Sequence, residues 1–372
     1  MIRWSLMYSI PVIKYLGSKR RLVPLLQEIV GALPDVTSVC DAFSGTTRVA
    51  QALKQPGVFV HANDTAPYAH VLATAYVEAD ATAIDTAKIT AWLNELNALP
   101  GVDGYVTQTF CRESRFFQPH NGMRIDAIRA AINDLTDDRV ERAILLTSLM
   151  EAADRVDSTT GVQMAYLKSW APRSHNDLEL RMPALTPGAG LATSEDAGEL
   201  ATTYRSYDMW YLDPPYNQHS YRANYHIWET LVRDDQPATY GVACKRTDIR
   251  DEPSPYNYRR SAHDAFAQLL TDIQARFVMV SFNDEGFLTR EDIEQMLAQR
   301  GDVVTLAVPT RRYVGAQIGI HNPNGKRVGS VSHTSNHELI YLAGEDVAAC
   351  IDDSMESMQH VLTPDTPAAH GR

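Results

Sequence analysis

The residue string Asp213-Pro214-Pro215-Tyr216 constrains this chain more than any other stretch of its sequence. It follows directly on Met209-Trp210-Tyr211-Leu212, a short apolar run rich in strand-forming residues. Such a run, ended by an acid, predicts a buried strand. Because two successive prolines cannot extend a β-ladder, the backbone must leave the sheet directly after Asp213. The sequence therefore predicts a buried strand from whose end Asp213 and Tyr216 emerge in a rigid turn.

These four residues suit the transfer of a carbon group to a planar amine such as the exocyclic nitrogen of adenine. That nitrogen is a poor nucleophile because its lone pair is delocalised into the ring. The carboxylate of Asp213 and the backbone carbonyl of Pro214 can accept its two hydrogens, and Tyr216 offers a face on which the base can stack. Preorganised groups of this kind typically contribute about 3–4 kcal/mol each to catalysis. A simple strand-terminating turn with an exposed acid would explain the prolines but not the tyrosine.

The length and composition fit one large α/β domain with an insert. The chain has 372 residues, of which 44% are hydrophobic, an ordinary share for a globular protein. No apolar run approaches the roughly 20 residues that span a bilayer. The first 13 residues also lack the pattern of a signal peptide. We therefore expect no membrane association and a cytoplasmic location.

Neither a metal site nor a disulfide framework is expected. The four cysteines are widely spaced and form no Cys-x-x-Cys pair. His219 and His226 have no third ligand at a suitable spacing. The formal net charge of −12 argues against a general polyanion binder, so any contact with nucleic acid has to come from local basic stretches.

The amino-terminal part of the chain begins like a nucleotide-binding α/β unit. Apolar residues at helical spacing predict a helix over 22–33, with Ser18 as its cap. A buried strand over 37–41 then leads into Phe43-Ser44-Gly45-Thr46-Thr47-Arg48 and a helix through Leu53. A strand, a glycine turn and a helix in this order are typical of such units, since the glycine lets the backbone approach a ligand closely.

An acid follows the next predicted strand. This strand, over 58–61, ends at Asn63-Asp64, about 20 residues after the first strand. In a parallel α/β sheet, an acid at this strand tip is placed to bind ribose hydroxyls. The alternative, in which Asp64 only begins the next helix, stays open.

Residues 78–190 predict a helical insert between the second strand and the strand that leads to Asp213. Helical spacing recurs over 84–99, 123–135 and 139–153, and the stretch is far longer than the usual connection of about 2–6 residues. We expect the insert to read DNA, and residues 1–77 plus 191–350 to form the catalytic domain. Further strands are predicted over 191–196, 277–282, 303–308 and 339–342, helices over 262–277 and from Thr289 to Gly301, and a disordered tail over 351–372.

Five motifs, taken together and in their order along the chain, resemble those of the Dam-type, alpha-class adenine-specific DNA methyltransferases. They are Lys14-Tyr15-Leu16-Gly17-Ser18-Lys19, Asp41-Ala42-Phe43-Ser44-Gly45, Asn63-Asp64, Asp213-Pro214-Pro215-Tyr216 and Ser281-Phe282-Asn283-Asp284-Glu285-Gly286. The resemblance covers most of the chain outside the insert and the tail. It implies an α/β, Rossmann-like fold that uses S-adenosylmethionine, and methylation of an adenine flipped out of duplex DNA.

The resemblance also implies which residues meet the methyl donor and the base. Asp213, Pro214 and Tyr216 would be catalytic. The donor would contact Lys14, Tyr15, Gly17, Lys19, Asp41, Phe43, Ser44, Gly45, Asp64 and Asp196. Two positions depart from the family's pattern, because Ala197 stands where an aromatic usually follows the acid and Thr47 replaces a glycine common in the first loop.

DNA contacts are expected from two basic stretches. Arg311 and Arg312 have no acid nearby and resemble the family's late basic loop. Acidic residues close in the sequence partly offset the positive charge of Lys245 and Arg246. Double-stranded DNA is thus the expected partner, with a cognate restriction endonuclease as a further partner that this class of enzyme allows.

Three alternatives stay open. Methylation of a glutamine side chain or of a cytosine amine is the nearest enzymatic rival, although families with those activities usually carry Asn or Ser at the position of Asp213. Methylation of adenines in RNA uses the same chemistry as methylation in DNA. A catalytically silent module that only binds DNA or the donor is the alternative from a different class.

Overall fold

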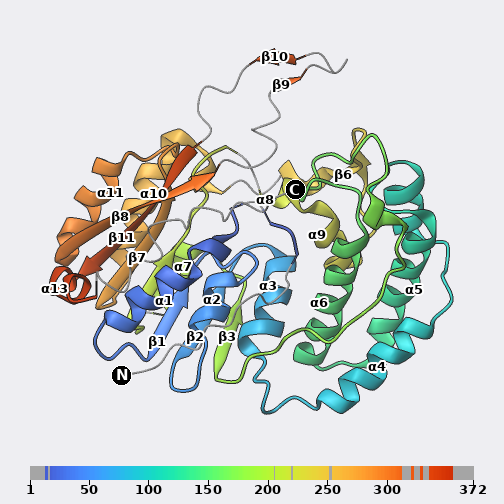
Figure 1. Cartoon of the computed structure of the whole chain (residues 1–372), viewed down its shortest axis with the longest axis horizontal. Coiled ribbons are helices and arrows are strands. Elements are labelled where there is room, and N and C mark those ends of the chain that lie inside the picture. The colour runs from blue at the N-terminus through green and yellow to red at the C-terminus, as the bar shows by residue number, and fades with distance from the viewer. Residues whose placement is uncertain are drawn as a thin grey trace, which may run out of the picture.

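A sheet with helices on both faces and a group of helices beside it make up the molecule (Figure 1). The structure, a computed structural model, describes residues 13–15, 17–204, 206–218, 221–250, 254–311, 320–321, 327–329 and 335–354. Among these residues, no helix is both long enough and apolar enough to cross a membrane.

The seven-stranded sheet has the order β3-β2-β1-β4-β7-β11-β8. Its strands are β1 (Ser38–Asp41), β2 (Phe59–Asn63), β3 (Gly190–Thr193), β4 (Met209–Leu212), β7 (Phe277–Asn283), β8 (Asp302–Arg311) and β11 (Ser335–Gly344). The neighbours from β3 to β7 are parallel, while β11 runs antiparallel to both β7 and β8. The chain steps from β1 out to β2 and β3, then returns to the other side of β1 with β4. This reversal of strand order is the switch point at which open α/β sheets bind ligands, and the mainly parallel sheet confirms the predicted Rossmann-like class.

Alternating side chains on the strands enter two cores, one on each face of the sheet. Met209 and Tyr211 of β4 enter the larger core, whereas Trp210 and Leu212 enter the smaller one. The larger core is covered by α1 (Val23–Ala32), α2 (Arg48–Leu53), α3 (Pro67–Ala73) and α13 (Val347–Asp352). The smaller core is covered by α7 (Ala197–Thr203), α10 (Arg259–Asp272) and α11 (Arg290–Leu297). Burial on both faces explains why the central strands read as continuous apolar runs.

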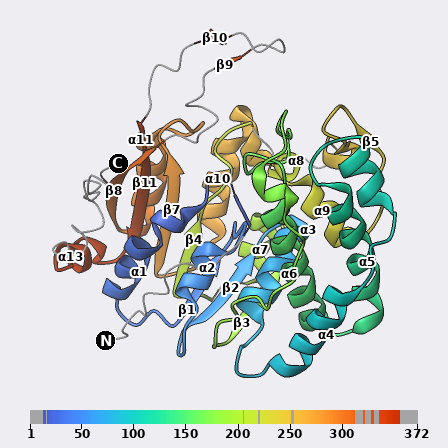
Figure 2. The ribbon, with the colours of Figure 1, turned by 45° about the vertical axis from the view of Figure 1, so that its right-hand side comes forward.

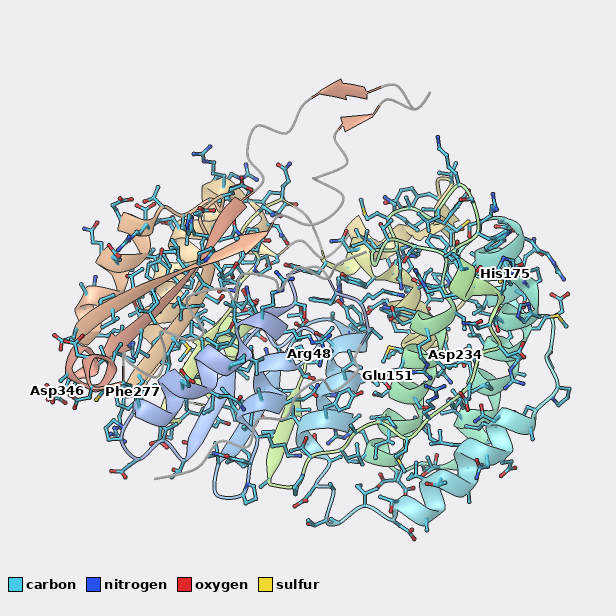
Figure 3. The ribbon with its side chains drawn as sticks, in the orientation of Figure 1. Arg48, Glu151, His175, Asp234, Phe277 and Asp346 are labelled. Carbon is cyan, nitrogen blue, oxygen red and sulfur yellow. The ribbon has the colours of Figure 1, made fainter. Side chains whose placement is uncertain are left out.

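The helical half of the molecule extends the larger core rather than forming a core of its own. It contains α4 (Thr86–Ala98), α5 (Pro119–Leu135) and α6 (Arg139–Val156), with π-helical turns over Thr74–Glu78 and Thr107–Arg112. The later helix α9 (His226–Arg233) packs among them and against α3 (Figure 2). Figure 3 shows Arg48 of α2 and Glu151 of α6 at the junction of the two halves, where their charges interact. The region predicted as an insert therefore shares its packing with a helix that follows Tyr216.

The remaining elements are short. They are α8 (Tyr221–Asn224), the hairpin of β5 (Thr239–Tyr240) and β6 (Lys245–Arg246), the strands β9 (Ile320–His321) and β10 (Arg327–Gly329), and 3₁₀ turns over Lys19–Arg21, Pro172–His175, Thr247–Arg250, Pro255–Asn257 and Ala298–Arg300.

The prediction that Ser18 caps the first helix is wrong. Its side chain makes no capping hydrogen bond, because the 3₁₀ turn Lys19–Arg21 comes first and α1 then starts with Pro24 in its first turn. Thr289 does cap its helix, with a reciprocal bond between Thr289 and Asp292. At the carboxyl end, α13 continues to Asp352, two residues into the segment predicted to be disordered. Residues 355–372 lie outside the described part of the chain.

Candidate functional site

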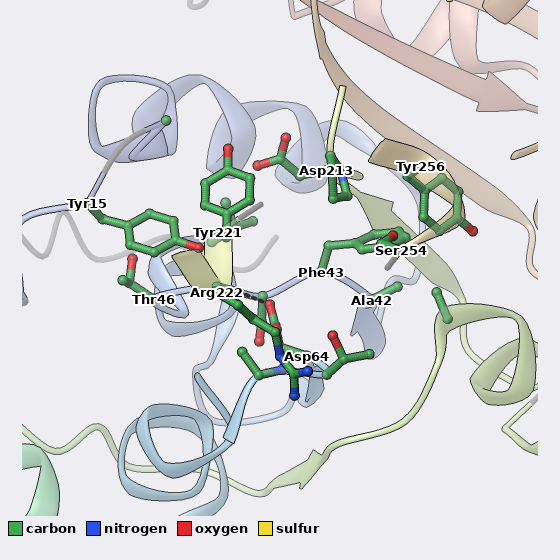
Figure 4. Close-up of a pocket in the computed structure, with 18 of the residues that line it drawn as sticks. Tyr15, Ala42, Phe43, Thr46, Asp64, Asp213, Tyr221, Arg222, Ser254 and Tyr256 are labelled. Atoms are coloured by element: carbon green, nitrogen blue, oxygen red, sulfur yellow. Dashed lines mark hydrogen bonds between the residues drawn. The ribbon is translucent and has the colours of Figure 1, made fainter. Parts of the chain in front are cut away.

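A cavity opens at the carboxyl ends of β1, β2, β3 and β4, at the switch point of the sheet. The segment after each of these strands contributes to its wall (Figure 4). These segments are Ala42 to Thr46 after β1, Asp64 to Ala66 after β2, Glu195 to Ala197 after β3, and Asp213 with Pro215 after β4. Side chains that lie far apart in the sequence therefore meet because parallel strands end at one edge of the sheet.

The loop after β1 has the left-handed backbone that its glycine favours. Gly45 has a φ of 49°, and Thr47 adopts the same region with a φ of 62°. The Thr47 hydroxyl donates to the carbonyl of Thr46 at 2.6 Å and accepts from Gln51 at 2.6 Å. Threonine thus keeps the glycine-like turn. The Ser44 hydroxyl is buried in the cavity wall and has no hydrogen-bond partner among the described residues, so a ligand here would find a free polar group.

Asp64 ties the loop after β1 to the loop after β2. One carboxylate oxygen accepts from the backbone N–H of Gly45 at 2.9 Å, and the other accepts from that of Ala66 at 2.9 Å. Burial raises the pKa of Asp64, while these two bonds act in the opposite direction. Each oxygen keeps a further lone pair that could accept a hydrogen from a ligand.

The first motif splits between the cavity and the helical half. Tyr15, Gly17 and Lys19 line the cavity, and the ring of Tyr15 stacks on Tyr221 with a centroid distance of 5.4 Å (Figure 4). The Lys14 side chain instead binds the carboxylate of Asp157 of the helical half at 2.9 Å and is absent from the cavity wall.

A buried group of charges surrounds Asp213. The ammonium of Lys19 lies 3.0 Å from Oδ1 of Asp213 and also contacts the carboxylate of Glu338 on β11. Burial raises the pKa of Asp213 to about 6, with Lys19 opposing and Glu338 adding to the shift. At neutral pH, Asp213 is therefore mainly an ionised hydrogen-bond acceptor at the edge of the cavity.

Pro214 and Tyr216 flank this cavity without lining it. Pro214 is buried, while Tyr216 is partly exposed. Its ring forms an edge-type contact with the ring of Phe282, with centroids 6.0 Å apart. The Tyr216 carbonyl accepts from the backbone N–H of Phe287 at 3.0 Å, which ties the turn to the segment after β7. Asp41 lies buried beneath the loop, and burial followed by the charges of Asp213 and Asp64 raises its pKa well above the usual range.

Two aromatic rings meet at the far end of the cavity. Phe43 contacts Tyr256 edge to face, with centroids 5.2 Å apart and planes at 88°. Asp196 beside them caps α7 by accepting from the N–H of Gly198 at 2.8 Å. Tyr256 comes from the turn Pro255–Asn257, whose Asn257 donates to the carbonyl of Asn217 at 2.7 Å. No local pattern marks Tyr256 as a site residue, because its turn lies 40 residues beyond Tyr216 and joins the site only through the fold.

The family model of the D12 class N6 adenine-specific DNA methyltransferases matches residues 15–296. The chain belongs to this family. The match includes every strand and turn that lines the cavity, from Tyr15 to Asn257. It confirms the Dam-type resemblance and, with it, the methyltransferase version of the Rossmann-like fold.

Curated relatives of this D12 family member are named as modification methylases or type II methyltransferases. The chain is 31% identical over 320 residues to modification methylase StsI of Streptococcus sanguinis, covering 81% of this chain and 48% of that protein. It is 29% identical to type II methyltransferase M.FokI of Planomicrobium okeanokoites, covering 90% and 53%. With M.NlaIII of Neisseria lactamica, identity is 28% and coverage 80% and 92%. The chain thus spans about half the length of the first two relatives and most of the third.

The residues of this family member that are expected to contact DNA differ in how they are placed in the structure. Arg246 is buried and forms ion pairs with Asp235 at 2.6 Å and Asp248 at 2.7 Å, so its charge is already used inside the protein. Lys245 is partly exposed, with its ammonium 5.9 Å from the ring centroid of Tyr240. Arg311 ends β8, but its side chain and all of Arg312 lie outside the described residues.

The described residues include no group of three or more His, Cys, Asp or Glu side chains placed to hold a metal ion. His226 is buried, and its Nε2 lies 3.0 Å from the backbone carbonyl of Gln163, while His219 lies outside the described part.

The sequence patterns did not single out four further residues of the candidate site, namely Arg48, Tyr221, Arg222 and Glu338. Tyr221 and Arg222 do lie in the polar and aromatic run that follows Tyr216, which was the available signal.

Proposed function

We propose that the protein is a site-specific DNA methyltransferase that methylates the exocyclic amine of adenine with S-adenosylmethionine as donor. One observation carries the proposal. The carboxylate of Asp213 leaves β4 at the switch point and borders the same cavity as the glycine loop and Asp64. A donor held by the loop and Asp64 would therefore present its reactive group next to the acceptor for the amine.

The cavity wall offers a fitting group for each part of such a donor. The rings of Phe43 and Tyr256 form an apolar end suited to a purine, and Asp64 has lone pairs suited to ribose hydroxyls. The Gly45 turn and the Ser44 hydroxyl, which has no hydrogen-bond partner among the described residues, line the same cavity. The donor, when bound, supplies a methyl group on a positively charged sulfur.

Asp213 and Pro214 then bind the amine of the adenine that accepts the methyl group. An adenine in duplex DNA must leave the base stack before its amine can reach them. The Asp213 carboxylate and the Pro214 carbonyl accept the two amine hydrogens, so the nitrogen lone pair turns towards the methyl carbon. As the nitrogen–carbon bond forms, the sulfur–carbon bond breaks and its electron pair stays on sulfur. The methylated amine, which then carries the positive charge, afterwards loses one proton to water.

Transfer of labelled methyl groups tests this function. The purified protein is incubated with the labelled donor and either duplex DNA or RNA, and the modified bases are mapped by sequencing. We expect N6-methyladenine in duplex DNA at one recognition sequence. Label in RNA alone would favour the RNA alternative, label on cytosine or on protein the other enzymatic rivals, and donor binding without transfer the silent module. The mapped sequence would also identify restriction endonucleases of the same specificity, whose cleavage of the modified DNA can then be assayed.

Asp64→Ala should weaken donor binding. Loss of a hydrogen bond from ribose to a charged group costs roughly 1–3 kcal/mol, or about a 5- to 150-fold rise in Kd. Calorimetric titration of S-adenosylmethionine measures this directly.

Asp208→Ala is the matched control for Asp64→Ala. Its carboxylate also accepts two backbone hydrogen bonds, from Thr37 at 2.9 Å and Ser38 at 3.0 Å, but at the opposite end of β4. Both variants should therefore lose thermal stability, whereas only Asp64→Ala should lose donor affinity. Equal donor affinity in the two variants would rule out the ribose contact.

A further inference from the structure

Three charged side chains from distant parts of the chain form one buried cluster. Lys19 comes from the turn before α1, Asp213 follows β4, and Glu338 lies within β11. Their side chains are 8%, 22% and 10% exposed, respectively. Lys19 contacts both carboxylates, and of the two acids only Asp213 lines the cavity. Glu338 is therefore close to the reaction centre without being in position to touch the base or the donor.

Glu338 is held more rigidly than a loop residue could be. It sits in the sheet between Asn283 of β7 and Val308 of β8, so its backbone is fixed on both sides. Its Oε1 also accepts a hydrogen bond from the Ser281 hydroxyl at 2.8 Å. The carboxylate can thus fix the position of the Lys19 ammonium.

The charges of the cluster do not cancel. Two carboxylates share one ammonium, which leaves a net charge of −1 beside the cavity. Burial alone lowers the pKa of Lys19, but Asp213 and Glu338 together raise it well above its usual value, so the ammonium stays charged. Burial would raise the pKa of Glu338, yet the contact with Lys19 holds it below its usual value. If Glu338 were absent, Lys19 would pair with Asp213 alone and neutralise it.

We propose that Lys19 and Glu338 are positioning residues for methyl transfer: Lys19 fixes one oxygen of Asp213, and Glu338 balances the Lys19 charge so that Asp213 keeps its own. Asp213 then accepts a hydrogen of the amine while positive charge moves from the sulfur of the donor to the nitrogen. A cluster with a net negative charge stabilises the positive charge that develops on that nitrogen, whereas a neutral pair of Lys19 and Asp213 would not. The role in transfer rests on the proposed function, whereas the charge arrangement does not. Lys19, expected from the sequence to bind the donor, thereby acts through Asp213.

Substitutions on the two sides of the cluster should shift the titration of Asp213 in opposite directions. Lys19→Met removes the positive neighbour, so the pKa of Asp213 should rise. Glu338→Gln removes the negative neighbour, so it should fall. A charge at this distance typically shifts a carboxyl pKa by about 1 unit or more. The other titratable groups whose charges interact with Asp213 are unchanged in both variants: Asp41, Tyr211, Tyr216 and Tyr221.

Carbon NMR of side-chain carboxyl groups, recorded against pH on the donor-free protein, measures the shift without any need for activity. The Asp213→Asn spectrum identifies the Asp213 signal. We expect a midpoint near 6 in the parent protein, a higher one in Lys19→Met and a lower one in Glu338→Gln. The acid limb of kcat/KM for DNA methylation should move in the same two directions.

Asp157→Asn is the matched control, because Asp157 pairs with Lys14 of the same motif at 2.9 Å and is buried outside the cavity. This variant should leave the Asp213 midpoint in place. Midpoints that stay unchanged, or that move together in the Lys19 and Glu338 variants, overturn the proposal. A parent protein that methylates no DNA overturns the proposed function instead, and the NMR titration still decides the charge arrangement.

Discussion

Asp213→Ala should lower kcat for DNA methylation by about 10²–10³-fold, the typical loss when one preorganised group is removed from a reaction centre. The variant loses the carboxylate that accepts an amine hydrogen, while the carbonyl of Pro214 remains. Lys19 and Glu338 stay paired with each other, so no buried charge is left without a partner. Folding and donor affinity should therefore remain close to those of the parent. Rapid-quench measurement of a single turnover, together with calorimetric donor binding, checks both halves of this expectation.

The pH profile of methylation by the parent protein should report the ionisation of the Asp213 carboxylate. Burial raises the pKa of Asp213 to about 6, so the carboxylate is ionised above that pH and protonated below it. Activity should fall as the pH drops through about 6, because a protonated Asp213 has lost its negative charge. Near-normal turnover of Asp213→Ala, or an acid limb that persists unchanged in that variant, would show that another group accepts the amine hydrogen.

Tyr216→Ala should weaken capture of the flipped base by roughly 1–3 kcal/mol, about 5- to 150-fold in KM for DNA, since stacking of a base on an aromatic ring contributes that much. The ring of Tyr216 is partly exposed and is supported on its edge by Phe282. Tyr216→Phe keeps the ring and loses only the hydrogen bond of the hydroxyl with Tyr221, so its effect should be mild. Fluorescence of 2-aminopurine at the target position reports base flipping in each variant.

Tyr258→Ala provides the control for loss of an aromatic ring. Tyr258 is 47% exposed and does not line the cavity, so its removal should change neither flipping nor KM. If Tyr216→Phe and Tyr216→Ala lose equal affinity for DNA, the hydroxyl rather than the ring holds the base, and stacking is the wrong explanation.

The part of the site that follows strand ends could be predicted from the sequence. Each central strand is a short buried apolar run, and the residues after β1, β2 and β4 must meet once the sheet is parallel. Gly45, Asp64 and Asp213 were therefore accessible to local reasoning, and all three line one cavity.

Contacts made by pairing or packing over long sequence distances could not be predicted. Glu338 reaches Lys19 only because β11 inserts between β7 and β8, and no local pattern specifies that order. Tyr256 reaches Phe43 through a turn anchored elsewhere in the chain. Arg246 is a further example, because its basic charge predicts a DNA contact that stays untested, whereas its ion pairs with its acidic neighbours, which include Asp248, become visible only in the fold.

The backbone conformation of Thr47 affects which sequence patterns can detect relatives of this chain. The loop after β1 holds a left-handed residue at this position, and the threonine hydroxyl secures it through Thr46 and Gln51. For a residue with a Cβ atom, the left-handed region costs about 1–2 kcal/mol, and two hydrogen bonds of about 1 kcal/mol each offset that cost. The loop therefore requires a backbone shape at residue 47 rather than a missing side chain. A search pattern that demands glycine there would pass over this chain, whereas one that also accepts threonine with a glutamine four residues later would retain it.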